Sequence, residues 1–384
     1  MKRGLGKNFL KKLTKVMLVS FGVFFSCLLT TQTVYAKTIK MQTLYLLKGD
    51  TKQISLGNNV NPQKYKWSSK NKKVASVNSN GTLTTFKKGY TLITAKRGKK
   101  QYKIKVYVRD EVDLIVFAGQ SNMSGAGDTS LAPALTKNAG YEYKAVTSPE
   151  SLEVLAEPFG KEENSEGLND GNFKTGSLVT AFVNSYYDQV KVPIVAVSAT
   201  RAGSGSQWWK SSLTIEASNR CKKAISYLKK RKIKIRHRYV VWFQGESDGL
   251  GRISEETYIN NMNDIYNCFR KRNKIEKIFL IRIGKYYDSA KETEKKRESI
   301  IYKDYFDIII KAQTNLCINH SGFVLVSTQA ASLGEGYYHS DGIHLTQSGL
   351  NILGYEAGKN AAYYVKTKRQ PGIYDEYLQR QLFY

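Results

Sequence analysis

VDLIVFAGQSNMSG, residues 112–125, joins an almost continuously apolar run to a cluster of small polar residues. A run such as 112–118 is typical of a strand buried on both faces of a sheet. The strand leads through Gly119 and Gln120 to Ser121. A serine in this place is either a nucleophile or a residue that begins a turn or helix. Which of the two applies depends on what other strands bring to the same edge of the sheet.

Four further apolar runs have the same character, and amphipathic stretches separate them. Continuous apolar strands that alternate with helices predict a parallel sheet covered on both faces, an α/β fold. With 384 residues and 41% hydrophobic residues, the chain can bury one large core and a smaller one. The further strands are expected at residues 192–199, 238–245, 277–284 and 322–329, and the helices at 176–190, 215–232, 255–272, 294–317 and 347–365.

Residues 40–108 follow another pattern. Six or seven short β-rich runs are separated by Gly, Asn and Lys turns, which predicts a small β-sandwich. The segment contains no histidine and no acidic pair, so we expect no chemistry from it. Residues 126–175 lack periodicity, and a loop of that length is usually functional. The expected sandwich core consists of Trp67, Val74, Val77, Leu83 and Ile93.

The first 36 residues are typical of a secretory signal peptide. Six basic residues precede an apolar stretch at about 16–29, and Val34-Tyr35-Ala36 resembles a cleavage site. The stretch is short for a membrane span, although an uncleaved anchor is the alternative. We therefore expect a secreted or cell-wall-associated protein, cut after about Ala36, without stable membrane insertion. The long charged leader favours a Gram-positive bacterium.

The formal net charge of the whole chain is +28, and it remains strongly positive without the six basic residues of the leader. Such a balance favours an acidic neighbourhood. A secreted protein rarely meets nucleic acid, so anionic cell-wall polymers are the expected partners. We expect lysine-rich solvated helices to account for about half of the charge. Three widely spaced cysteines remain after the leader, and they indicate neither a disulfide framework nor a zinc site.

Polar clusters follow four of the five buried strands. Ligands of open α/β sheets bind beyond the carboxyl ends of the strands, so these clusters are expected to meet. Each cluster alone is weak evidence, because turns and helix caps use the same residue types. Together they bring a hydroxyl, an amide, carboxylates and an imidazole to one edge. The clusters are residues 119–122, 201–204, 244–248 and 338–344.

The chain has only four histidines. His237 precedes a strand at its amino end and His320 follows a helix, so both are expected to be structural. His339 and His344 remain. Asp341 precedes His344 by three residues, and a single turn lets its carboxylate accept from the ring Nδ1–H. Nε2 of His344 is then free to act as a general base.

The blocks GQSNMSG (119–125), the Gly203 segment, WFQGESD (242–248) and DGIHLT (341–346) resemble the SGNH/GDSL hydrolase superfamily. They are most similar to its sialate O-acetylesterase-like members, carbohydrate esterase family 6, which includes acetylxylan esterases. The similarity spans residues 112–364. It implies a three-layer α/β/α flavodoxin-like sandwich and a serine esterase for acetylated sugars that needs no metal or other cofactor. Residues 67–98 in turn resemble the bacterial Ig-like domain of group 2.

The resemblance implies a role for each site residue. Ser121 is the expected nucleophile, His344 the base and Asp341 the acid that orients it. The backbone amides of Ser121 and Gly203 and the side chain of Gln244 are the expected oxyanion donors. Gln244 stands where the wider superfamily has an asparagine.

Two departures from the superfamily pattern leave alternatives open. The block RAGSGSQWW (201–209) lacks the common double glycine, so Gly205 competes with Gly203 as a donor. Glu246 is the alternative acid for His344. Trp208, Trp209 and the 126–175 loop are expected to wall the pocket, with a place in the core as the alternative for either tryptophan.

We expect four segments: a signal peptide (1–36), an Ig-like β-sandwich (37–109), an SGNH-type esterase domain (110–366) and a C-terminal tail (367–384). The expected function is a secreted serine esterase that removes acetyl groups from sugars such as xylan or sialic acid. The alternatives are a cell-wall O-acetyltransferase with the same triad and a non-catalytic carbohydrate-binding or adhesion protein.

Overall fold

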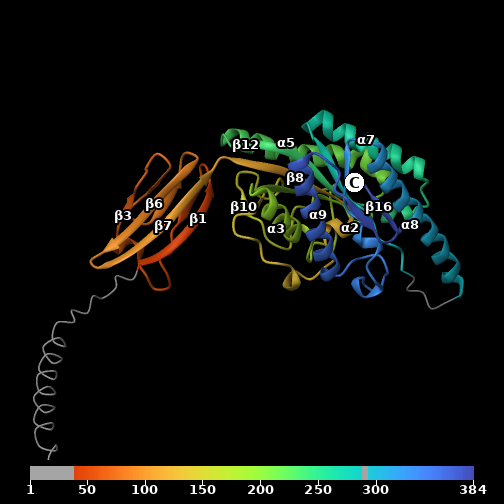
Figure 1. Ribbon diagram of the computed structural model, residues 1–384, viewed down its shortest axis with the longest axis horizontal. Coiled ribbons are helices and arrows are strands. Elements are labelled where there is room, and N and C mark those ends of the chain that lie inside the picture. Colours follow the sequence, from red (N-terminus) through yellow and green to blue (C-terminus); the bar gives the residue numbers. More distant parts are fainter. Residues whose placement is uncertain (1–38, 288–292) are drawn as a thin grey trace, which may run out of the picture.

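The computed structural model describes residues 39–287 and 293–384, which form a small β domain beside a larger α/β domain (Figure 1). The predicted signal peptide lies outside the described residues. Within these two ranges, no helix is both long enough and apolar enough to cross a membrane.

The N-terminal domain is a sandwich of two sheets. One sheet has the order β1-β7-β6-β3, in which β1 runs parallel to β7, and the other has the order β2-β5-β4. Leu83, Ile93 and Val106 are buried between the sheets, while Trp67 and Val77 pack at the edge of this core. The strands are β1 (Ile39–Leu47), β2 (Thr51–Gln53), β3 (Lys66–Ser69), β4 (Ala75–Val77), β5 (Thr82–Thr85), β6 (Gly89–Arg97) and β7 (Lys100–Arg109).

The second domain is built on a seven-stranded sheet of order β10-β9-β11-β8-β12-β13-β14. All pairs are parallel except β10 with β9, so the predicted parallel sheet is confirmed. The edge strand β10 and its neighbour β9 come from the segment expected to be a loop. The strands are β8 (Glu111–Gly119), β9 (Gly140–Glu142), β10 (Glu153–Val154), β11 (Ile194–Thr200), β12 (Lys234–Phe243), β13 (Lys277–Ile281) and β14 (Phe323–Ser327).

Helices cover both faces of this sheet, which confirms the predicted α/β/α layering (Figure 1). α3 and α9 pack on each other on one face, and α5, α7 and α8 cover the other. α3 and α9 approach closely at Gly358. A Cβ at this position would lie 2.2 Å from the carbonyl oxygen of Phe182, so the contact requires glycine. The five long helices are α3 (Val179–Val190), α5 (Thr214–Lys230), α7 (Glu255–Asn273), α8 (Thr293–Asn319) and α9 (Gln347–Thr367).

The C-terminal segment is more than a tail. β15 (Ile373–Asp375) and β16 (Arg380–Leu382) form a hairpin, and Ile373 and Leu382 are buried in the core of the α/β domain. Asp375 forms a fully buried, two-pronged ion pair with Arg282, one bond of which measures 2.8 Å. Burial opposes ionisation of Asp375, but the Arg282 guanidinium lowers the pKa of Asp375 below its usual value. The hairpin therefore belongs to the α/β domain.

Candidate active site

The turn after β8 places Ser121 at the carboxyl edge of the sheet. Gly119 has φ +149°, and a Cβ there would lie 2.0 Å from the Phe243 carbonyl oxygen, so only glycine fits. Ser121 begins the short helix α2 (Ser121–Ser124) and is buried. The N–H groups of a first helical turn have no partner within the helix, so the Ser121 amide is free to donate.

Ser121, His344 and Asp341 form a continuous chain of hydrogen-bonding groups. Nε2 of His344 lies 2.8 Å from Oγ of Ser121, and Nδ1 lies 2.7 Å from Oδ2 of Asp341. The other carboxylate oxygen accepts the backbone N–H groups of Ile343 and His344, each at 2.9 Å. Burial opposes ionisation of Asp341, but these hydrogen bonds lower the pKa of Asp341. An ionised Asp341 holds the Nδ1–H tautomer and leaves Nε2 to accept the serine proton.

Asn122 joins α2 to the loop that carries His344, a role that the sequence did not indicate. Its Oδ1 accepts the N–H of Leu345 at 2.9 Å, and its Nδ2 donates to the Ile343 carbonyl at 3.1 Å. These two bonds fix the residues on both sides of His344 relative to the residue after Ser121. The only available clue was the position of Asn122 beside the candidate serine.

Glu246 contacts Asn122 and, among the described residues, has no hydrogen bond or ion pair with His344. Nδ2 of Asn122 donates to its Oε1 at 2.6 Å, while its Oε2 is buried without a hydrogen-bond partner among the described residues. Burial raises the pKa of Glu246 above its usual value. Of the two candidate acids, Asp341 is the one in contact with the imidazole.

Gly203 follows β11 at the same edge of the sheet, where Thr200 pairs with Gly119. Gly203 has φ +65°, and its N–H has no hydrogen-bond partner in the described part of the chain. Gly205, the competing candidate, has φ −81° in an extended conformation and precedes the short helix α4 (Ser206–Trp208). The N–H of Gly205 has no hydrogen-bond partner among the described residues either, so the choice of Gly203 over Gly205 as donor stays a prediction, while the N–H of Ser121 is available.

The side chain of Gln244, an expected oxyanion donor, is hydrogen-bonded within the protein instead. Its amide nitrogen lies 3.0 Å from the Ser204 carbonyl, 3.3 Å from Oε1 of Gln120 and within hydrogen-bond range of Asp248. An amide group has two hydrogens, so none is left for a substrate in this arrangement. The side chain instead holds the loop that carries Gly203 against α6 (Glu246–Leu250).

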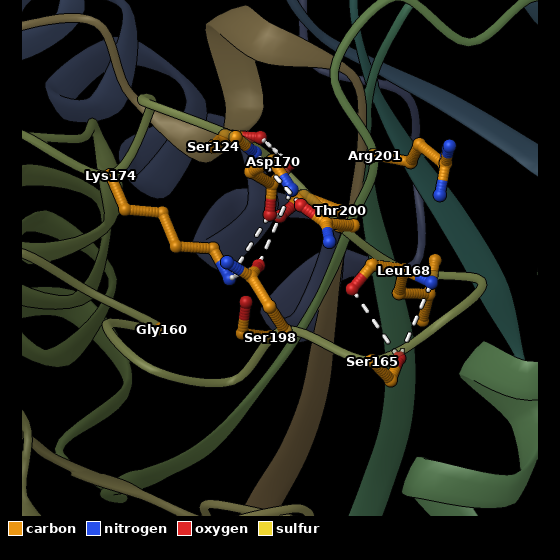
Figure 2. A network of polar contacts seen from close by, with 12 residues as sticks. Ser124, Gly160, Ser165, Leu168, Asp170, Lys174, Ser198, Thr200 and Arg201 are labelled. Carbon is orange, nitrogen blue, oxygen red and sulfur yellow. Dashed lines mark hydrogen bonds and ion pairs between the residues drawn. The ribbon is translucent and has the colours of Figure 1, made fainter.

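A buried polar network lies beneath α2 (Figure 2). Asp170 accepts the hydroxyls of Ser124, on α2, and of Thr200, at the end of β11, the latter at 2.7 Å. Nζ of Lys174 lies 3.0 Å from Asp170 and 3.0 Å from Oδ1 of Asn164. The carboxylate of Asp170 therefore links α2 to β11, the strand before Gly203. Sequence reasoning missed these residues, because Asp170 and Lys174 stand in a segment without periodicity.

The 126–175 segment also reaches His344, since the ring centroids of Phe173 and His344 lie 4.9 Å apart. The two tryptophans, Trp208 and Trp209, differ in burial. Trp209 is a core residue whose indole donates to Ser204 Oγ at 2.8 Å. Trp208 is exposed, and the Arg201 guanidinium lies 4.2 Å from its ring centroid. Of these two tryptophans, Trp208 is therefore the one that is accessible to a ligand.

The other three histidines have structural partners. His237 contacts Glu276 at 3.0 Å, and Nδ1 of His320 accepts the N–H of Gly322 at 2.9 Å. His339 donates to the Ala126 carbonyl at 3.0 Å. Among residues 39–287 and 293–384, no group of three or more His, Cys, Asp or Glu is arranged to hold a metal ion.

Comparisons with known proteins agree with this architecture. Residues 111–362 match the family model described as carbohydrate esterase, sialic acid-specific acetylesterase, and residues 33–107 match the bacterial Ig-like domain of group 2. No curated protein matches the chain. A solved protein from Arabidopsis thaliana is 21% identical, with a TM-score of 0.50, covering 67% of this chain and 99% of its own.

A carbohydrate acetylesterase from Xanthomonas citri is 13% identical, with a TM-score of 0.42, covering 84% of this chain and 73% of its own. The likeness to the Arabidopsis structure, at 21% identity, concerns the fold alone. The family model, in contrast, spans well over half of the chain. The chain therefore belongs to the carbohydrate esterase family of sialic acid-specific acetylesterases, which are carboxylic ester hydrolases, and carries a bacterial Ig-like domain on the N-terminal side of the esterase domain.

Proposed function

We propose that this chain is a secreted esterase that removes O-acetyl groups from sugars through an acetyl-enzyme on Ser121. The observation that carries the proposal is the chain of contacts from Asp341 to His344 at 2.7 Å and from His344 to Ser121 at 2.8 Å. Both distances lie within the range of about 2.6–3.2 Å that proton transfer between positioned groups requires. A serine hydroxyl is a weak nucleophile at neutral pH and needs such a base.

In the first half of the reaction, Ser121 Oγ forms a bond to the acetyl carbon while its proton passes to Nε2 of His344. The carbonyl oxygen gains negative charge and is stabilised by the N–H groups of Ser121 and Gly203. The ester C–O bond then breaks. The sugar oxygen leaves with the proton from His344, and the acetyl group stays on Ser121.

In the second half, water attacks the acetyl carbon and gives a proton to His344. The bond to Ser121 Oγ breaks, the serine recovers its proton, and acetate leaves. Asp341 stays ionised throughout and stabilises the imidazolium in both halves. Asn122 and Gln244 act as positioning residues, the first for the histidine loop and the second for the Gly203 loop.

The substrate that we propose is an acetylated sugar of a polysaccharide or glycan outside the cell. Trp208 is exposed beside the Gly203 loop, where an aromatic ring offers a stacking surface for a sugar. The leader-like first 36 residues support secretion, and the Ig-like domain is compatible with it.

The test is to incubate the mature protein with a panel of acetylated glycans, without any added acceptor, and to measure acetate. Samples quenched in acid during turnover are digested and analysed by mass spectrometry. We expect acetate release and an acetyl group on the peptide that contains Ser121. Transfer to a sugar acceptor with no acetate released to water would identify an acetyltransferase instead.

A further inference from the structure

The positive charge of the chain is concentrated in the Ig-like domain. Residues 39–109 contain seventeen Lys and Arg against a single acid, Asp50, whereas residues 110–384 contain thirty-six against thirty-one. The helices of the esterase domain therefore contribute little to the net charge, in contrast to the expectation from the sequence. A domain that carries so much charge of one sign repels itself, which favours a role for the charge in binding.

Very little of this charge is neutralised within the molecule. Asp50 is paired with Arg231 of the esterase domain at 3.1 Å. Among the cations from Lys48 to Arg109, Lys88 is the one with an ion pair in the described part of the chain, to Asp110 and Glu111. Of the lysines on the sheet β1-β7-β6-β3, Lys66 and Lys96 are exposed, and Lys103 and Lys105 are half-buried.

Strand alternation gathers several of these lysines on one surface, the outer face of the sheet β1-β7-β6-β3. On β7, Ile104 and Val106 point into the core, so Lys103 and Lys105 point outward. On the same outer side, Lys96 of β6 pairs in register with Lys66 of β3. We call Lys66, Lys96, Lys103 and Lys105 the basic strip.

Three tyrosines form a row across the same outer face. Tyr107 of β7 stands between Tyr45 of β1 and Tyr90 of β6 in the strand register. The ring centroids of Tyr45 and Tyr107 lie 4.9 Å apart, and those of Tyr90 and Tyr107 lie 5.0 Å apart. Tyr90 is 44% exposed, so the end of the row is accessible. Flat aromatic rings beside lysines match a polymer that has both sugar faces and negative charges.

The strip is separate from the active site. β7 leads directly into β8, which begins at Glu111 beside the sandwich and ends at Gly119 beside Ser121 (Figure 1). Nine extended residues span about 25–30 Å. Arg231 and Lys137 hold the two domains together through the Lys48 carbonyl at 3.2 Å and the Thr43 carbonyl at 2.7 Å. A polymer bound on the strip would thus be anchored at a fixed distance from the catalytic serine.

We propose that the outer face of this sheet binds an acidic polysaccharide, with the basic strip neutralising its anionic groups and the tyrosine row contacting its sugar rings. The choice of a polysaccharide rests on the proposed function, because the enzyme domain of the same chain acts on carbohydrate esters. The binding of anions rests on the lysines alone.

The test uses the mature full-length protein and measures binding to polygalacturonate, a carboxylated polysaccharide without acetyl groups, by affinity electrophoresis. The quadruple variant K66Q/K96Q/K103Q/K105Q is compared with K222Q/K229Q/K271Q/K359Q, which removes the same charge from exposed helix positions of the esterase domain. We expect the strip variant to bind at least about tenfold more weakly and the control to change less than about twofold. Neutral dextran should not bind, and about 0.5 M salt should abolish binding to polygalacturonate.

A second comparison addresses the tyrosines. Tyr90→Ala should weaken binding to polygalacturonate but leave binding to polyglutamate, an anion without sugar rings, unchanged. If the two quadruple variants weakened polygalacturonate binding equally, the basic strip would not be the binding site, because only the overall charge of the protein would then matter. Tighter binding to single-stranded DNA or to anionic vesicles than to polygalacturonate would overturn the choice of a polysaccharide.

Hydrolysis of a small acetyl ester is measured on the same samples. All variants should keep the wild-type rate, since none touches the active site. A wild-type protein that binds the polymer yet hydrolyses no acetyl ester would refute the proposed function and leave the binding face in place.

Discussion

Lys174 and Asp170 form an ion pair of 3.0 Å that is buried between α2 and the end of β11. The carboxylate also accepts the hydroxyls of Ser124 and Thr200, so it connects the two backbone segments that carry Ser121 and Gly203 (Figure 2). The geometry of the proposed oxyanion site therefore depends on residues that do not touch the substrate.

Removal of the lysine alone should destabilise the protein. Lys174→Met leaves Asp170 buried without its cation, which costs about 3–5 kcal/mol of unfolding free energy in comparable buried pairs. The double variant D170N/K174M has no unpaired charge and should recover a large part of this loss. Urea unfolding of the two variants and the wild type is the measurement. A single variant as stable as the wild type would show that the pair contributes nothing.

The contacts of Asp341 and Glu246 predict unequal effects on catalysis. Asp341→Asn removes the ionised partner of His344 and should lower kcat by about 10³–10⁴-fold with KM little changed. Glu246→Gln keeps an oxygen for the Asn122 amide and should cost less than about tenfold. Steady-state kinetics on a small acetyl ester compare the two. A reversed order would identify Glu246 as the acid that orients the histidine.

Glu246 also predicts a dependence of stability on pH. Burial raises its pKa above the ordinary value of 4.5, so the folded state binds this proton more tightly than the unfolded state. The unfolding free energy contributed by this group therefore falls as pH rises above that value. Between about pH 5 and about pH 8, the wild type should lose stability relative to Glu246→Gln, whose side chain stays neutral. Parallel unfolding curves across this range would contradict the assignment.

The Ig-like domain should be dispensable for the chemistry. Apart from Leu47, which packs in the core of the esterase domain, its core is separate, and it contributes no residue to the site. A chain without residues 37–108 should keep its kcat on a small ester but be retained less by cell walls. A shortened protein that folds, as judged by circular dichroism, yet hydrolyses nothing would show that the sandwich shapes the active site.

The long elements of the esterase domain could be predicted because their sequence patterns are strong and local. β8 and β14, for example, are nearly continuous apolar runs, and α7 begins and ends within one residue of the expected bounds. The hairpin β15–β16 was missed because strands of three residues show no periodicity. Asp170 and Asn122 were missed because their roles arise from contacts with distant segments. The place of Gln244 differs from the family expectation because Asp248, four residues further on, attracts its amide.

The central claim is that Ser121 is the nucleophile, and the rate of Ser121→Ala on a small acetyl ester tests it most directly. The substitution removes one hydroxyl at the start of α2 and should leave the melting temperature close to that of the wild type. We predict that kcat falls by about 10⁴-fold or more, as when the nucleophile of other catalytic triads is removed. A folded Ser121→Ala protein that keeps more than a small fraction of the wild-type kcat would contradict the account.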